Sequence, residues 1–207
     1  LKVIREKNPP GQLRFYPGSP LITRQLLRTE DRLIVNELHP EDHRQLAKLF
    51  PRDRQVKVLN LNGWIALKAL LPPKENRGVI LIDPPFELEG EFDRMADGIR
   101  EGYHRFATGT FFLWYPIKDL SVIHQFHKKI TTLGLKNILV AEFFIGPIAN
   151  DQQLMGCGNL IINPPFTLAS QLQSLLPEFG SLFGENGQAS FCLSTQLPIQ
   201  RGSLRPR

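Results

Sequence analysis

Short apolar runs of strand length alternate along this sequence with stretches of helical periodicity. Seven runs have the length and composition of strands, at residues 32–38, 55–59, 78–82, 110–115, 137–145, 159–162 and 189–194. Six stretches between them have the period of helices, at residues 20–28, 41–50, 64–71, 91–106, 121–133 and 168–176. This alternation favours a mostly parallel sheet whose strands are connected by helices. We therefore predict a single α/β domain over residues 1–207, with the two last strands as an antiparallel pair at the sheet edge.

Composition limits the kind of protein that this chain can be. Of the 207 residues 42% are hydrophobic, which suffices for a sizeable core, and no run of 18 apolar residues or signal-peptide pattern occurs. We expect a cytoplasmic protein without a membrane partner. The formal charge of +5 suits a polyanionic partner, although the 25 basic residues are spread along the chain. Residues 201–207 have the composition of a disordered basic tail.

The cysteines and histidines do not form a recognisable metal or redox pattern. Cys157 and Cys192 lack paired spacing and are expected to be two small buried apolar side chains. His124 and His127 lie three residues apart on a predicted helix, but no carboxylate or cysteine accompanies them, so we expect a solvated face. The sequence has no P-loop and no GxSxG motif, which leaves phosphoryl transfer and serine hydrolysis without support. We expect no disulfide and no metal.

The predicted strand 78–82 runs directly into Asp83-Pro84-Pro85-Phe86. Ligands of open α/β sheets bind at the carboxyl ends of strands. Methylation of an adenine N6 amine needs hydrogen-bond acceptors for the amine, because its lone pair is delocalised into the ring. Asp83 and a carbonyl of the rigid Pro84-Pro85 pair can supply acceptors, and Phe86 can stack on an extruded base. The motif therefore predicts an adenine methyltransferase, and the alternative is an ordinary Asp-Pro turn.

The same pattern recurs, with Asn in place of Asp, at residues 163–166 after the strand 159–162. Asp83 follows two strand and helix pairs and precedes several more, which suits a central strand. Asn163 lies near the end of the chain, where a strand is more often at the sheet edge. We therefore predict that Asp83-Pro84-Pro85-Phe86 is catalytic and that the motif at Asn163 is structural.

Three further places at the ends of predicted elements are candidates for nucleotide binding. Glu37 ends a strand, where a carboxylate can accept both hydroxyls of a ribose. Asn62 follows the next strand and can bond the adenine amine of a cofactor, while Gly63 lets the backbone approach closely. Ser19 and Pro20 form a helix start, in which Ser19 can cap free N–H groups or meet a carboxylate. A solvated Glu, a plain turn and a simple helix cap are the alternatives.

A known family, the large-subunit ribosomal RNA methyltransferase J family, is similar to this sequence in six segments that occur in this order: GQLRFYPGSPLI, NELHPEDH, LNGW, GVILIDPPFE, EGYHRFATGTFFLWYP and LIINPPF. The resemblance runs from about residue 11 to residue 194, and members of the family make N6-methyladenine in 23S rRNA. It implies a Rossmann-like class I methyltransferase sheet, S-adenosylmethionine as cofactor, and protein-free 23S rRNA as partner. It also implies a role for five residues: Asp83 as the catalytic acidic residue, and Ser19, Glu37, Asn62, Gly63 and Asp83 in the cofactor pocket.

The sequence departs from the family pattern in three places. The family commonly has Asp at the position of Asn62, which still accepts a hydrogen bond, and Tyr at the position of Phe86, which keeps stacking but lacks a hydroxyl. The family also begins with a segment that has a His-rich N-terminus and a Gly-rich loop of the type DxxAGxG. That segment supplies the first strand and much of the cofactor site, and nothing like it occurs in this sequence. We expect the chain to be a fragment of the enzyme.

Other functions stay open at this point. A DNA adenine methyltransferase is one alternative, because it has the same fold and the motif at Asp83 does not distinguish RNA from DNA. The resemblance also implies a DNA-linked role as an alternative, since the family has been associated with the use of external DNA as a nutrient. A nucleic-acid-binding module without catalysis is favoured if the upstream segment is truly absent.

Overall fold

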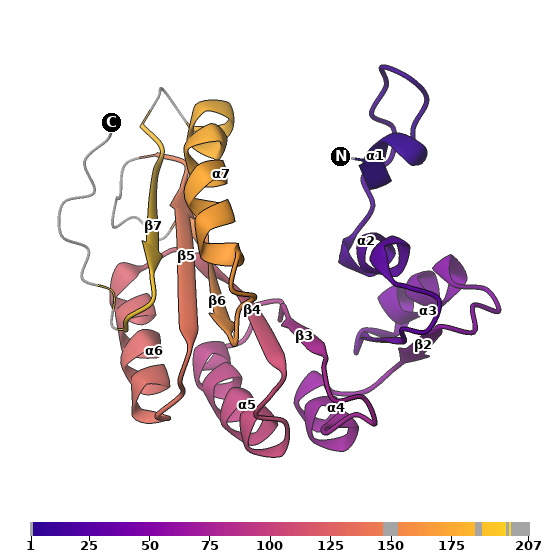
Figure 1. Ribbon diagram of the computed structural model, residues 1–207, viewed down its shortest axis with the longest axis horizontal. Coiled ribbons are helices and arrows are strands. Elements are labelled where there is room, and N and C mark those ends of the chain that lie inside the picture. The colour runs from indigo at the N-terminus through magenta and orange to yellow at the C-terminus, as the bar shows by residue number, and fades with distance from the viewer. Residues whose placement is uncertain (1, 147–152, 185–187, 198, 200–207) are drawn as a thin grey trace. The chain divides into compact units, whose positions relative to one another are not determined.

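The computed structural model describes residues 2–146, 153–184, 188–197 and 199, and the chain divides into two compact units, residues 1–69 and residues 70–207 (Figure 1). Each unit has its own sheet. The expectation of a single methyltransferase domain stays a prediction. The predicted tail at residues 201–207 lies outside the described residues.

The first unit is built on a two-stranded parallel sheet, in which β1 (Leu33–Asn36) pairs with β2 (Val56–Leu59). Four helices begin in this unit: α1 (Lys2–Glu6), α2 (Ser19–Leu26), α3 (Pro40–Leu49) and α4 (Gly63–Leu70). Helix α3 begins with Pro40, whose fixed φ suits the first turn, and the His39 side chain accepts a hydrogen bond from the Asp42 backbone N–H. Val35 and Phe50 are buried between α3 and the sheet.

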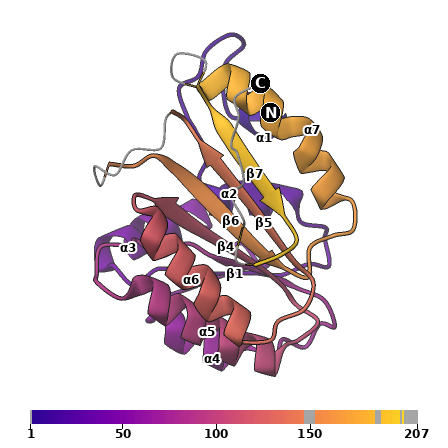
Figure 2. The same cartoon turned by 90° about the vertical axis from the view of Figure 1, so that its left-hand side faces the viewer.

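The second unit holds a five-stranded mixed sheet in the order β3-β4-β6-β5-β7. The strands are β3 (Val79–Ile82), β4 (Thr110–Ile117), β5 (Ile138–Phe144), β6 (Gly156–Ile162) and β7 (Ser190–Ser194). The pairing makes β3, β4 and β5 parallel to one another, whereas β6 and β7 run in the opposite direction. Helices α5 (Glu91–Arg105) and α6 (Leu120–Thr132) cover one face of this sheet and α7 (Leu168–Phe183) covers the other (Figures 1 and 2).

The predicted elements are all present, and most of their ends differ by a few residues. The largest difference is at α7, which was expected to end at Leu176 and continues to Phe183 with Pro177 inside it. Proline removes one helical N–H, yet the helix continues through it, with Leu176 buried directly before the proline and the helix packed against β7. Helix α1 lies in a polar stretch and was not expected.

The strand order differs from the expectation in two respects. The strand that leads to Asp83, β3, is the first strand of the described sheet and not a central one, whereas β6, which leads to Asn163, lies between β4 and β5. The two last strands do not pair with each other, because β6 pairs with β4 and β5 while β7 pairs with β5. Because β6 returns between two earlier strands, its apolar end is buried on both faces of the sheet.

A buried polar group of three side chains connects β4, α6 and β5. The Tyr115 hydroxyl on β4 lies 3.1 Å from Nε2 of His127 on α6 and donates to Oε1 of Glu142 on β5 at 3.1 Å. These three side chains are at most 1% exposed. The expectation of a solvated face is therefore wrong for His127, because its partners come from strands that the helix sequence does not reveal.

Gly158 on β6 allows this arrangement. It is the register partner of both Tyr115 on β4 and Glu142 on β5, so the tyrosine ring crosses β6 at this position to reach the carboxylate. A Cβ atom on residue 158 would collide with the Tyr115 ring. The glycine is thus required by a close approach between two strands of the core.

We predict that Gly158→Ala lowers the free energy of unfolding by about 1–3 kcal/mol or more, because overpacking forces the Tyr115 ring out of place. Urea unfolding followed by circular dichroism measures this change. Gly180→Ala on α7 is the matched control: its Cβ would meet only Ala189 at 3.7 Å, and alanine favours helix, so this variant should be as stable as wild type or more stable. Equal stability of Gly158→Ala and wild type would contradict the account of the core.

Candidate active site

The motif Asp83-Pro84-Pro85-Phe86 leaves the second unit's sheet at the carboxyl end of β3. Strands β3 and β4 are parallel with Ile82 opposite Leu113, so the motif lies at the edge where ligands of α/β sheets bind. Asp83 is partly exposed, and partial burial of its carboxyl group raises its pKa above the ordinary value. The motif thus combines a carboxylate acceptor with an accessible position.

Phe86 is held by two other aromatic side chains. Its ring centroid lies 4.9 Å from that of Phe92 on α5 and 6.2 Å from that of Trp114 on β4, the latter in an edge-on arrangement. The backbone of Phe86 has φ of 52°, in the left-handed region that favours glycine. The ring is half-buried, so part of it stays open to a ligand.

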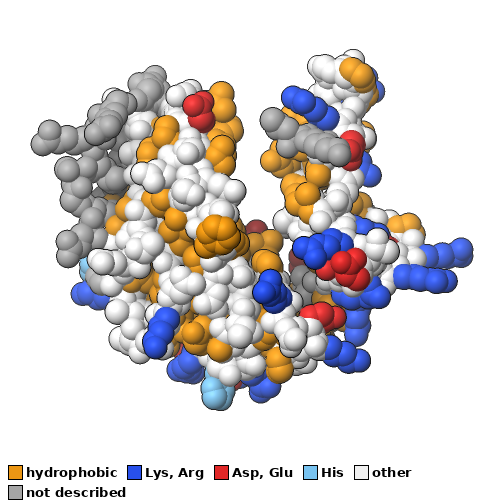
Figure 3. Space-filling view, in the orientation of Figure 1, with side chains coloured by type: hydrophobic (Ala, Val, Ile, Leu, Met, Phe, Trp, Pro, Cys, Tyr) orange, Lys and Arg blue, Asp and Glu red, His pale blue; other side chains and the backbone are white. Residues whose placement is uncertain are grey.

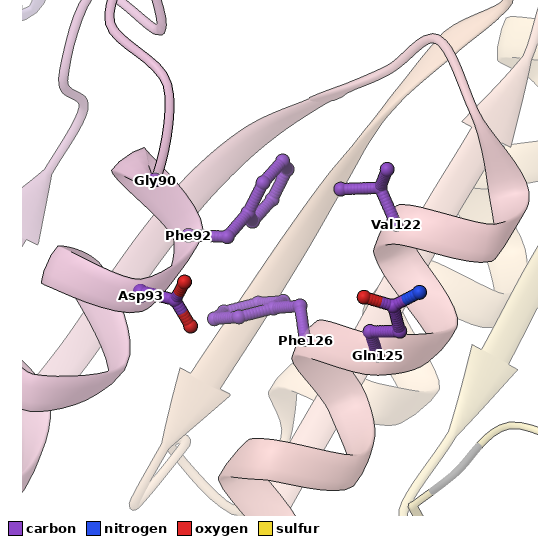
Figure 4. A pocket seen from close by; sticks show the side chains of 6 residues that line it. All are labelled: Gly90, Phe92, Asp93, Val122, Gln125 and Phe126. Carbon is purple, nitrogen blue, oxygen red and sulfur yellow. The ribbon is translucent and has the colours of Figure 1, made fainter.

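A pocket of about 190 Å³ lies beside these aromatic residues, between the first turn of α5 and α6 (Figure 4). Phe92 and Phe126 give it two ring faces, and Gln125 gives it an amide group. Asp93 at its rim accepts from the Lys129 ammonium group at 2.9 Å, which neutralises its charge. Since Phe92 also contacts Phe86, the pocket adjoins the motif through one shared ring.

The second motif, at Asn163, lies at the other end of the strands from Asp83, near the beginning of β4. Because β6 is antiparallel to β4, Ile162 pairs with Phe111 near the beginning of β4. The Asn163 amide donates to the backbone carbonyls of Ala107 and Gly109 at 2.8 and 2.9 Å. Its side chain thus ties down the loop after α5, which fits the predicted structural role.

Glu37 lies directly after β1 in the first unit, and its loop is tied to the loop after β2. The Asn60 side chain donates to the carbonyls of Glu37 and Leu38 at 2.6 and 2.9 Å, and the Glu37 N–H donates to the Leu59 carbonyl at 3.1 Å. The Glu37 carboxylate accepts from the His39 N–H at 2.8 Å through Oε1. The two loops therefore present a fixed, half-buried carboxylate at the carboxyl edge of this sheet.

Asn62 occupies the cap position of α4, and this changes its expected role. Its Oδ1 accepts from the N–H groups of Trp64 and Ile65 at 3.0 and 3.4 Å. The oxygen is thus engaged by the helix start, whereas the amide Nδ2 is left as a donor, which suits a ring nitrogen of adenine better than its amine. A Cβ atom on Gly63 would meet nothing within 4 Å, so there is room for a ligand against its backbone.

Ser19 is the first residue of α2, but it does not cap that helix. The cap position belongs to Gly18, and no side chain bonds the free N–H groups there, so the expected Ser19 cap is wrong. Ser19 is exposed. Its predicted place in a cofactor pocket, like those of Glu37, Asn62 and Gly63, lies in the first unit, whereas Asp83 belongs to the second.

Trp114 and Phe92 are site neighbours that sequence reasoning missed. The signal for Trp114 was its place in the aromatic run Phe111–Tyr115, at the carboxyl end of the strand after the motif. Within the described ranges, no group of three or more His, Cys, Asp or Glu side chains could hold a metal ion, and no helix is long and apolar enough to cross a membrane. Cys157 and Cys192 are half-buried.

Comparison with known proteins identifies relatives over nearly the whole chain. The family model described as "Ribosomal RNA large subunit methyltransferase D, RlmJ" matches residues 1–193. A protein of Haemophilus influenzae named "Ribosomal RNA large subunit methyltransferase J" is 39% identical over 199 residues, which are 96% of this chain and 71% of the relative. The Escherichia coli protein of the same name is 41% identical over 177 residues, covering 86% and 63%. The chain thus spans 71% and 63% of the length of these two relatives.

Solved structures share the fold. A crystal structure of a Legionella pneumophila protein matches with a TM-score of 0.88 and 34% identity over 95% of this chain and 73% of that protein. A probable spermidine synthase from Corynebacterium glutamicum matches with a TM-score of 0.52 and 16% identity over 77% and 57%. The second likeness shows the fold alone, and it agrees with the expected Rossmann-like sheet of class I methyltransferases.

We predict that Asp83→Asn does not destabilise the protein at pH 8. Burial disfavours the ionised form, so the folded-state pKa is above the unfolded one and the charge costs stability at every pH above the raised pKa. The stability that the variant gains by losing this charge should shrink as the pH falls through the raised pKa and vanish below the ordinary one. Denaturant unfolding at several pH values measures it. A variant that loses stability at pH 8 but not at pH 4 would show that the ionised Asp83 carboxylate stabilises the fold, which would contradict the raised pKa of Asp83.

Proposed function

This chain belongs to the ribosomal RNA large subunit methyltransferase D (RlmJ) family, and from this premise we propose that the protein methylates the N6 amine of an adenine in 23S rRNA. The observation that carries the proposal is the position of Asp83-Pro84-Pro85-Phe86 at the carboxyl end of β3. There a carboxylate, free proline carbonyls and a half-exposed ring come together on one short loop.

The loop residues have distinct tasks in this proposal. Asp83 and a carbonyl of Pro84 or Pro85 accept hydrogen bonds from the adenine amine, which directs its lone pair toward the methyl group. Partial burial of Asp83 strengthens these bonds, because hydrogen bonds are electrostatically stronger at low dielectric. Phe86 stacks on the base with the part of its ring that stays open. After transfer, the amine releases one of its protons to solvent.

S-adenosylmethionine supplies the methyl group when it is bound, and residues of the first unit fit parts of it. Glu37 offers a carboxylate for the ribose hydroxyls from a loop that Asn60 holds in place. Asn62 offers its amide Nδ2 to an adenine ring nitrogen, and Gly63 leaves open space for the adenosine. Ser19 of the first unit and Asp83 of the second are the other residues that we propose for cofactor binding.

The charge distribution supports a polyanionic substrate. Residues 1–69 carry 13 Lys and Arg against 7 Asp and Glu, whereas the remaining residues carry 12 against 13. Lys and Arg side chains stand out on the visible surface of the first unit (Figure 3). The basic excess therefore belongs to one unit, which fits contact with RNA phosphates through that unit. An enzyme of 23S rRNA works in the cytoplasm, and we propose protein-free rRNA as its substrate.

Methyl transfer from labelled S-adenosylmethionine to purified 23S rRNA and to duplex DNA tests the proposal, using the complete gene product. We expect label in N6-methyladenine of rRNA alone, and a fall of about 100-fold or more in kcat for Asp83→Asn, because that variant removes the negative charge beside the reacting amine and replaces one carboxylate oxygen by an NH2 donor.

Asp97→Asn is the matched control, since Asp97 is a half-exposed carboxylate of the neighbouring helix α5 that pairs with Arg100 and does not line the pocket. It should retain the activity of wild type. Label in DNA alone would assign the protein to DNA adenine methylation, no transfer to either would leave a nucleic-acid-binding module, and full activity of Asp83→Asn would overturn the role of the motif.

A further inference from the structure

Trp114 lies on β4 at the point where the motif leaves β3. Ile82, the last residue of β3, is the register partner of Leu113 on β4. Asp83 and Trp114 are the next residues along the two chain segments, so Trp114 is the first residue of β4 beyond its pairing with β3.

Trp114 also contacts the aromatic residue of the motif. Its ring meets Phe86 at a centroid distance of 6.2 Å and an interplanar angle of 68°, while Phe92 closes the other side of Phe86 at 4.9 Å and 51°. Edge-on and tilted pairs of this kind have a preferred geometry. Two neighbours at these angles restrict the rotation of the Phe86 ring, whose backbone already adopts an unfavourable φ.

Trp114 is itself restricted by the strand on its other side. Strand β6 pairs with β4 along its whole length, with Asn159 opposite Trp114 and Cys157 opposite Pro116. Trp114 is half-buried in this position, so the paired strand limits the space into which the indole can turn.

We propose that Trp114 is a positioning residue for the target adenine: it holds Phe86 at the angle at which the base stacks with its N6 amine beside Asp83. This inference rests on the proposed methyl transfer and deepens it. Trp114 acts through Phe86, so its removal should misplace the stacked base without removing an acceptor from the amine. The cost then falls on turnover and not on binding of S-adenosylmethionine.

Steady-state kinetics of methyl transfer to purified 23S rRNA tests the inference in the complete gene product. We expect Trp114→Ala to lower kcat by roughly three- to tenfold, the loss of one aromatic pair, while KM for S-adenosylmethionine changes less than about twofold. Trp114→Phe keeps an aromatic edge toward Phe86 and should stay within about threefold of wild type.

Phe112→Ala is the matched control. Phe112 is a half-buried aromatic residue two positions earlier on the same face of β4, and its register partner is Leu81. Its replacement should lower the unfolding temperature as Trp114→Ala does, but leave kcat of the folded protein unchanged.

The outcomes separate this inference from the proposed function. Equal loss of kcat in Trp114→Ala and Phe112→Ala, or a rise in both KM values with kcat unchanged, would overturn the positioning role. If the wild-type protein is active and Asp83→Asn is not, the proposed function holds whether or not the positioning role of Trp114 is overturned. An inactive wild-type protein would contradict the proposed function, and the positioning role with it.

Discussion

The parallel register of β3 and β4 is the constraint on which the candidate active site depends. Placing Ile82, the last residue of β3, opposite Leu113 of β4 sets the point at which Asp83 leaves the sheet, with Trp114 as the next residue of β4. Parallel strands need a crossover, here α5, whose first turn supplies Phe92 against Phe86. The pairing of β3 with β4 thus places the Asp83 carboxylate. The crossover helix α5 that this pairing requires supplies Phe92, one of the two rings that hold Phe86.

The remainder of the second unit fixes the alignment of β4. Strand β6 returns between β4 and β5, and Tyr115 crosses it at Gly158 to reach Glu142. A slip of one residue between β4 and β6 would turn Tyr115 to the opposite face and break its bond to the carboxylate, and a slip between β5 and β6 would turn Glu142 away in the same manner. The buried polar group therefore specifies the alignment of the strand that also carries Trp114.

Local features of the structure could be predicted from the sequence, whereas features that depend on strand order could not. Every strand and the place of Asp83 at a strand end follow from apolar runs and turn residues. The burial of His127 depends on Tyr115 and Glu142, which lie 12 and 15 positions away in the sequence. The capping role of Asn62 depends on where α4 begins. The reason for choosing Asp83 over Asn163 was wrong, since the strand before Asn163 lies between two others and the strand before Asp83 is the first of the described sheet. The choice itself stays a prediction.

The most direct test of the account is the nucleoside content of 23S rRNA from cells that lack the gene. If this protein methylates one adenine of 23S rRNA, mass spectrometry of this rRNA finds one N6-methyladenine fewer than in wild-type cells. A plasmid copy of the gene should restore the modification, and the same copy with Asp83→Asn should not. An unchanged N6-methyladenine content in the deletion strain would contradict the central claim that this protein methylates an adenine of the large-subunit rRNA.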